Sequence, residues 1–187
     1  MKSTTENKFH PVHGMIHWIL AFGMLLVYLT GFLRMTWMDK KHVASIIEGV
    51  NNTIDHDEVI KMAKAIREPM WEWHIFAAYV IFFAFATRLI YMAVKGIRFP
   101  NPFDTKNPLK DRFQGSIYIL FYIFVGINVI TGIYLKWIEG PLKDTMEDIH
   151  KWGLYWFPIF ILLHFGGIWL GEKTTKKGVV SKMIGGD

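Results

Sequence analysis

The sequence predicts an all-α integral membrane protein, a four-helix bundle whose helices span the bilayer. Of its 187 residues 52% are apolar, and these include 8 tryptophans and 15 phenylalanines. The apolar residues gather in four stretches, each close to the ~20 residues that a helix needs to cross ~30 Å of hydrocarbon. Four such helices can close into one bundle, so we expect a single transmembrane domain over residues 1–187.

The first predicted span covers residues 11–34 and holds no Lys, Arg, Asp or Glu before its last residue. It is too long for the apolar region of a signal peptide, and we expect it to stay in the protein. An outer loop follows at residues 35–70, in which apolar residues recur at helical spacing in two runs, with Asp55 or Asp57 placed to cap the second. Two short amphipathic helices are expected there, as a lid over the bundle or as a docking surface.

The remaining predicted spans are residues 72–95, 113–136 and 150–170. Within its apolar run the span at 72–95 carries one charged residue, Arg88. Pro100, Pro102 and Pro108 make the connection between the second and third spans irregular.

The charges predict the orientation of the chain in the membrane. If both termini and the loop between the second and third spans share one side, that side holds 11 Lys and Arg residues and the other holds 9. This bias favours a multi-pass chain with both termini in the cytoplasm. The net charge of +5 is then explained by membrane anchoring, and no other feature favours a nucleic-acid partner.

Four histidines lie in or at the ends of these apolar stretches, and three stretches repeat one interval of 14 residues. The interval runs from His17 to Gly31, from His74 to Arg88 and from His150 to His164. Fourteen residues bring a helix back to within about 40° of its starting direction, ~21 Å further along. The two residues that bound each interval therefore lie on one face of their helix, at two different depths of the membrane. Ionisable side chains in hydrocarbon usually mark function, and neutral imidazole suits haem iron.

The direction of each span pairs these histidines by depth. His17 begins the first span on the inner side, and His74 begins the second span on the outer side. The fourth span enters from the outer side, so His150 is outer and His164 is inner. We therefore expect two b haems, one between His17 and His164 and one between His74 and His150. Neither can be attached covalently through thioethers, because the chain contains no cysteine.

Gly31 and Arg88 occupy the other positions of the same pattern. A glycine at the level of the outer haem lets a porphyrin approach the backbone, although helix packing alone also explains it. Arg88 lies near the inner haem, where its guanidinium can either pair with a propionate or extend to the inner surface.

The other histidines have a weaker pattern. His10, His13 and His17 have a spacing that suits a further haem or metal site, but no carboxylate or cysteine accompanies them. His42 and His56 fall in the outer loop, where we expect them to be solvated.

Four features of the sequence together resemble a known family. They are His17-Trp18, His74, the run Asp148-Ile149-His150-Lys151-Trp152 leading to His164, and the tail at residues 179–185. The family they resemble is the b-type cytochrome subunit of membrane-bound nickel–iron hydrogenases, whose wider superfamily includes the membrane subunit of respiratory formate dehydrogenase and small prokaryotic di-haem cytochromes b. The resemblance implies a four-helix bundle, two b haems on those four histidines, and quinone chemistry at the cytoplasmic end. Gly14 departs from the family, which often has arginine there.

A quinone needs an interfacial pocket beside one haem, with polar groups to hold its carbonyls. His13, Asn107 and Gln114 come from the start of the first span, the irregular loop and the start of the third span, near the depth of the inner haem. They are candidates for binding menaquinone or ubiquinone. Ordinary interfacial polar residues are the alternative for each one.

Two functions follow as hypotheses. In the first, the chain is the quinone-reactive electron-transfer subunit of an oxidoreductase and takes electrons from a periplasmic iron–sulfur or haem partner of the hydrogenase kind. In the second, it works alone as a quinol-oxidising di-haem cytochrome b that passes electrons to a soluble acceptor. A structural bundle without a cofactor is the third class, and it leaves the four intramembrane histidines unexplained.

Overall fold

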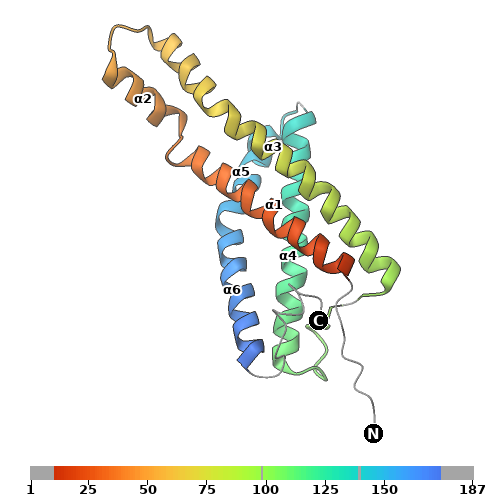
Figure 1. Ribbon diagram of the computed structural model, residues 1–187. Coiled ribbons are helices and arrows are strands. Elements are labelled where there is room, and N and C mark those ends of the chain that lie inside the picture. Colours follow the sequence, from red (N-terminus) through yellow and green to blue (C-terminus); the bar gives the residue numbers. More distant parts are fainter. Residues whose placement is uncertain (1–10, 98, 139, 174–187) are drawn as a thin grey trace. The chain divides into compact units, whose positions relative to one another are not determined.

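The computed structural model describes residues 11–173 except 98 and 139. Within these residues it contains six helices and no strand. Long apolar helices are α1 (Pro11–Met35), α3 (His56–Lys95), α4 (Leu109–Trp137) and the consecutive pair α5 (Lys143–Lys151) and α6 (Gly153–Lys173); α2 (Lys40–Val50) is short (Figure 1). Counting α5 and α6 as one, four of them are long and apolar enough to cross a membrane. The predicted all-α membrane fold with four spanning helices is confirmed.

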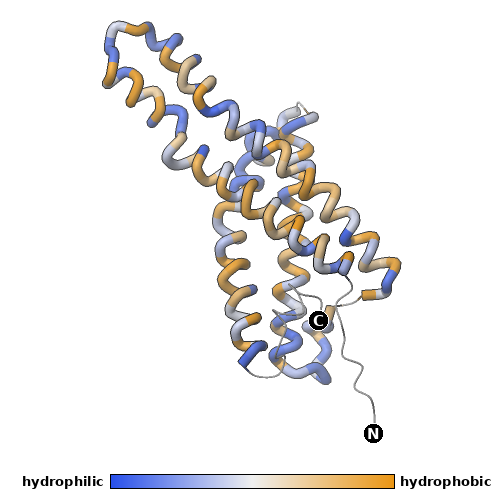
Figure 2. Tube along the Cα trace, viewed as in Figure 1, coloured by the Kyte–Doolittle hydropathy of each residue, from blue (hydrophilic) through white to orange (hydrophobic). Residues whose placement is uncertain are grey.

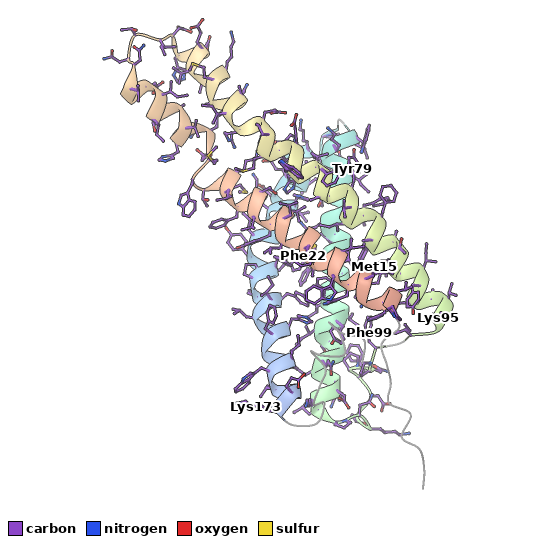
Figure 3. The ribbon with its side chains drawn as sticks, viewed as in Figure 1. Met15, Phe22, Tyr79, Lys95, Phe99 and Lys173 are labelled. Carbon is purple, nitrogen blue, oxygen red and sulfur yellow. The ribbon has the colours of Figure 1, made fainter. Side chains whose placement is uncertain are left out.

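The outer surface of the spans suits lipid better than water. Only 6–28% of the residues in each apolar window are buried inside the protein. Met15 and Phe22 of α1, both labelled in Figure 3, are two of the exposed side chains. Apolar residues predominate along α4 and α6, and polar residues concentrate near the ends of these helices (Figure 2). Because an aqueous protein rarely exposes so much contiguous apolar surface, hydrocarbon is the solvent that covers it.

The described residues group into two compact units, of which one comprises residues 20–83 and the other comprises the described residues before and after it. In the first unit, α2 and the beginning of α3 form a helical hairpin (Figure 1). Its small core consists of Val43, Ala44, Val59 and Ala63. Val59 and Ala63 have no exposed surface, so this cluster holds the two helices together.

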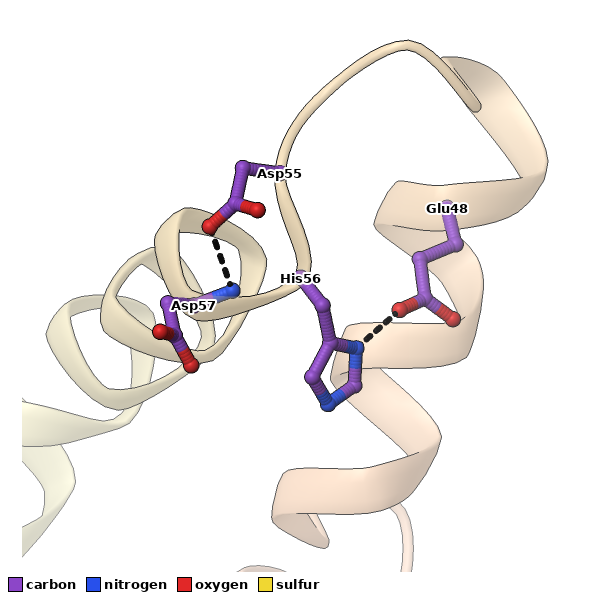
Figure 4. A network of polar contacts seen from close by, with 4 residues as sticks. All are labelled: Glu48, Asp55, His56 and Asp57. Atoms are coloured by element: carbon purple, nitrogen blue, oxygen red, sulfur yellow. Dashed lines mark hydrogen bonds and ion pairs between the residues drawn. The ribbon is translucent and has the colours of Figure 1, made fainter.

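Two aspartates begin the helices of this hairpin. Asp39 accepts hydrogen bonds from the backbone N–H groups of Lys41 at 2.9 Å and His42 at 3.4 Å. The bond from Lys41 is the main reason why the pKa of Asp39 lies below its ordinary value, because a donated hydrogen bond favours the charged carboxylate. Asp55 accepts from the N–H of Asp57 at 3.0 Å (Figure 4). Of the two candidates for the second cap, Asp55 is therefore the one that caps.

The second amphipathic run is not a separate helix. It begins α3 at His56, and α3 continues through Pro69 to Lys95, whereas the second span was expected to begin at residue 72. Proline removes one backbone donor and crowds the preceding turn, but its fixed φ is compatible with a helix. Helical periodicity on both sides of Pro69 outweighs this local interruption.

The second unit contains α4, which packs against α5 and α6. The predicted helix at residues 150–170 is divided here, because α5 ends at Lys151 and α6 begins at Gly153. Between them the N–H of Trp152 bonds the carbonyl of Ile149 at 3.1 Å, which closes a tight turn. His150 therefore lies on α5 and His164 on α6.

The loop before α4 rests on the first turns of that helix. Arg112 donates from Nε to the carbonyl of Pro102 at 2.7 Å. A Cβ atom on Gly115 would overlap the carbonyl oxygen of Pro100, so only glycine allows this close approach.

Candidate functional site

His17 on α1 and His164 on α6 face each other. Their ring centroids lie 6.1 Å apart, and their planes are inclined by 42°. Two imidazole nitrogens that each lie ~2 Å from one metal ion place their ring centroids roughly 6 Å apart. Phe160 stacks on His164 with a centroid distance of 5.4 Å, and Trp18 meets His17 edge-on at 5.6 Å. Aromatic neighbours thus hold the two rings at a spacing that suits the axial ligands of one iron.

Arg88 of α3 adds a cation with an unused donor near this pair. Its Nε donates to the hydroxyl of Tyr122, which in turn donates to the sulfur of Met92 at 3.3 Å. Its Nη1 is buried and has no hydrogen-bond partner within the described residues. Tyr91, one turn after Arg88 on α3, has its ring centroid 6.3 Å from that of His13, which lies one turn before His17 on α1. Because buried donors are normally paired, this nitrogen suits a carboxylate such as a haem propionate.

Side chains of α4 surround His150. Thr131 places its Oγ1 3.0 Å from Nδ1 of the imidazole. A Cβ atom on Gly132 would lie 3.3 Å from Cε1, so the missing side chain makes room for the ring. Asn128 donates to the carbonyl of His150 at 2.8 Å and accepts from Nε1 of Trp156 at 2.9 Å. Through Asn128, one side chain of α4 ties α5 to α6 across the interruption between them.

His74 has a matching environment in the 20–83 unit. Thr30 of α1 places its Oγ1 2.9 Å from Nδ1 of His74. A Cβ atom on Gly31 would lie 3.6 Å from Cε1 of the same ring. Trp71 stacks on the imidazole with a centroid distance of 5.4 Å and an angle of 5°, and the guanidinium of Arg34 lies 4.8 Å over Trp71. Gly31 therefore lies against the imidazole of His74.

The two threonines were not predicted from the sequence as part of the site. Thr30 and Thr131 are the only buried polar residues in the part of the chain that the structure describes. Each is followed by glycine, and the dipeptide Thr-Gly occurs in the chain at residues 30–31 and 131–132 only. This repeated dipeptide within two apolar spans is the signal that was available.

The candidate quinone ligands make local contacts. His13 lies in the first turn of α1. Asn107 donates from Nδ2 to the carbonyl of Asn101 at 3.2 Å, and Gln114 donates from Nε2 to the hydroxyl of Tyr118 at 2.9 Å. A shared quinone pocket stays a prediction.

The remaining histidines belong to the hairpin or to the N-terminus. His42 and His56 are exposed, and Nδ1 of His56 lies 2.8 Å from a carboxylate oxygen of Glu48 (Figure 4). Among the residues between 11 and 173 that the structure describes, no group of three or more His, Cys, Asp or Glu side chains is arranged to hold a metal ion. His10, which the alternative metal site requires, lies outside the described residues.

The bridging role of Asn128 predicts a loss of stability. Asn128→Ala leaves the indole N–H of Trp156 and the carbonyl of His150 without these partners, so we expect the free energy of unfolding to fall by about 1–3 kcal/mol. Thermal unfolding in detergent, followed by circular dichroism, measures this. Asn52→Ala is the control, because Asn52 is exposed in the turn before α3. Equal stability of the two variants would contradict the bridging role.

Comparison with known proteins identifies the family of the chain. A family model described as prokaryotic cytochrome b561 matches residues 8–186. No curated protein and no solved structure matches the chain. The matched range includes all four candidate ligands and also the tail at residues 179–185, which lies outside the described residues. The chain therefore belongs to the prokaryotic cytochrome b561 family, and it is a membrane cytochrome of the b type that takes part in electron transfer.

Proposed function

We propose that this cytochrome holds two b haems and carries electrons between a periplasmic redox partner and quinone in the bacterial inner membrane. The observation that supports this best is the opposed pair of His17 and His164, 6.1 Å apart, with the unused Nη1 of Arg88 nearby. His17 and His164 would bind the iron of the inner haem, and Arg88 would pair with a propionate. A bound haem supplies a one-electron ferric–ferrous couple.

The outer haem is assigned to His74 and His150. Each of these histidines has a threonine hydroxyl within 3.0 Å of Nδ1 and a glycine beside Cε1. Equivalent surroundings support an equivalent role. The directions of the spans support their pairing at one depth, because each histidine is near the outer beginning of its apolar stretch.

The depths of the two proposed haems give the proposed direction of electron transfer. A periplasmic iron–sulfur or haem subunit, hydrogenase-like in kind, would donate electrons at the outer side. Menaquinone or ubiquinone would accept them at the inner side, near His13, Asn107 and Gln114, and would take protons from the cytoplasm. Reduction of the quinone would then move charge across the membrane.

The hairpin of α2 and the beginning of α3 supports an outer partner. Ile46, Val50 and Ile66 stay exposed on it, although the hairpin has a core of its own. Exposed apolar groups of this kind are typical of binding surfaces. A chain that oxidises quinol and reduces a soluble acceptor without a partner subunit would favour the alternative, a stand-alone cytochrome.

The first test counts the haems and their ligands. We expect two b haems per chain in a pyridine haemochrome assay, because two ligand pairs are available. His17→Ala and His164→Ala should each remove one spectral component, and His74→Ala and His150→Ala should each remove the other.

His42→Ala is the control for these four variants, because His42 is exposed on the hairpin and should leave both components intact. One haem per chain would contradict the proposal. Loss of the same component in the His17 and His150 variants would contradict the pairing.

The orientation can be tested with single thiols, because the chain has no cysteine of its own. Asn52→Cys, in the hairpin, should react with an impermeant thiol reagent in intact cells. Thr105→Cys, in the exposed loop before α4, should react only after lysis. The reverse pattern would place both termini outside the cytoplasm.

The quinone site can be tested separately from the haems. Asn107→Ala combined with Gln114→Ala should slow quinone turnover by roughly tenfold or more, because a lost hydrogen bond to the carbonyls is worth ~1 kcal/mol each. Both haem spectra should stay unchanged. Asn52→Ala is again the control. Normal turnover in the double variant would place the quinone elsewhere.

A further inference from the structure

The two buried threonines each lie between a helix carbonyl and a histidine. Oγ1 of Thr30 lies 2.7 Å from the carbonyl oxygen of Leu26 and 2.9 Å from Nδ1 of His74. A second carbonyl, that of Val27, lies 3.1 Å from the same hydroxyl. A threonine bonded to the carbonyl of the preceding turn is common in helices, but here the hydroxyl also meets an imidazole.

Thr131 repeats this arrangement in the other unit. Its Oγ1 lies 2.8 Å from the carbonyl oxygen of Ile127, 3.1 Å from that of Asn128 and 3.0 Å from Nδ1 of His150. The two threonines are 7% and 3% exposed, so water does not replace these partners.

The number of protons decides which atom donates. A hydroxyl has one proton, and a carbonyl oxygen can only accept, so each threonine donates to the preceding turn of its own helix. The hydroxyl oxygen is then left to accept from the imidazole, which requires a proton on Nδ1. A neutral imidazole has one N–H group, and Nε2 is consequently the unprotonated nitrogen, which can act as an acceptor or a ligand. Each threonine thereby selects one tautomer of its histidine.

The glycine that follows each threonine completes the arrangement. At Gly31 and Gly132 the position of a Cβ atom would be 3.6 and 3.3 Å from Cε1, the ring carbon between the two nitrogens. A larger residue at Gly132 would push the ring of His150 away from the hydroxyl. At His150 the Thr-Gly dipeptide therefore sets the proton and the position of the ring together, whereas at His74 the contact with Gly31 is an ordinary van der Waals contact.

We propose that Thr30 and Thr131 are positioning residues that hold His74 and His150 in the tautomer whose Nε2 binds haem iron, and that each threonine lowers the reduction potential of the haem that its histidine binds. The inference rests on the proposed function, in which both histidines are axial ligands. An acceptor at Nδ1–H increases the electron donation of the imidazole to the metal, which favours the ferric form. The hydroxyl is a better acceptor because it already donates to a carbonyl.

The test compares Thr30→Val, Thr131→Val and the double variant with the corresponding serine variants. Valine keeps the shape of threonine without the hydroxyl, and serine keeps the hydroxyl. Spectroelectrochemical titration of the purified cytochrome should show a higher potential for the component assigned to His74 and His150. The component assigned to His17 and His164 should not move. A tenfold loss of ferric preference corresponds to about 59 mV for one electron.

Haem content gives a second measurement. Loss of a partner behind a metal ligand typically weakens metal binding by about 10–100-fold, so the valine variants should also lose this haem more readily on dilution. Serine should restore both the potential and the haem content. Thr36→Val is the matched control, because Thr36 also donates to the preceding turn, to Phe32 at 2.8 Å, but is exposed.

Each outcome is decisive. An unchanged or lower potential in the double valine variant would overturn the proposal, as would an equal shift in Thr36→Val. If a valine variant loses the haem altogether, recovery in the serine variant supports the proposal and its absence overturns it. Full haem content in His74→Ala and His150→Ala would instead refute the proposed function, because these histidines would then not be ligands.

Discussion

Hydrocarbon offers no hydrogen-bond partner, so each polar group inside the spans of this chain must find one within the protein. A ligand histidine shows this constraint clearly, since the nitrogen that faces away from the metal carries a proton that needs an acceptor. Thr30 and Thr131 accept at His74 and His150, and their own protons go to helix carbonyls. In each chain of hydrogen bonds, from imidazole through hydroxyl to carbonyl, every proton has an acceptor. The two histidines can therefore be buried at a defined angle without water.

The same constraint explains the junction of α5 and α6. A helix interruption frees backbone groups, and in an apolar surrounding these groups need side-chain partners. Asn128 supplies one by donating to the carbonyl of His150, and its own oxygen is satisfied by Trp156. Gly153 leaves room for it, because a Cβ there would lie 3.1 Å from the amide nitrogen of Asn128. Asn128 thus holds the backbone of His150 at the interruption, and Thr131 of the same helix holds its imidazole.

The features predicted correctly from the sequence are those that a local pattern of residues determines. Hydropathy located the four spans, and the 14-residue interval selected the histidines, since both are properties of consecutive residues. Contacts between segments that are distant in the sequence could not be predicted from it. The passage of α3 through Pro69 and the division of the last span at Trp152 contradicted local expectations. The partnership of Thr131 with His150 requires knowing which helix faces which, and only the repeated Thr-Gly dipeptide hinted at it.

The two proposed haem sites differ in the charge around them, and this difference bears on the direction of electron transfer. At the His17 site the guanidinium of Arg88 supplies a positive charge with a buried, unpartnered Nη1, and a cation beside a haem favours the ferrous form, which raises its potential. At His74 and His150 neutral hydroxyls accept from the imidazoles, which favours the ferric form and lowers the potential. Both effects would make the proposed inner haem the better electron acceptor. Electrons delivered at the outer side would therefore move inward downhill, toward the side where the quinone is proposed to be reduced.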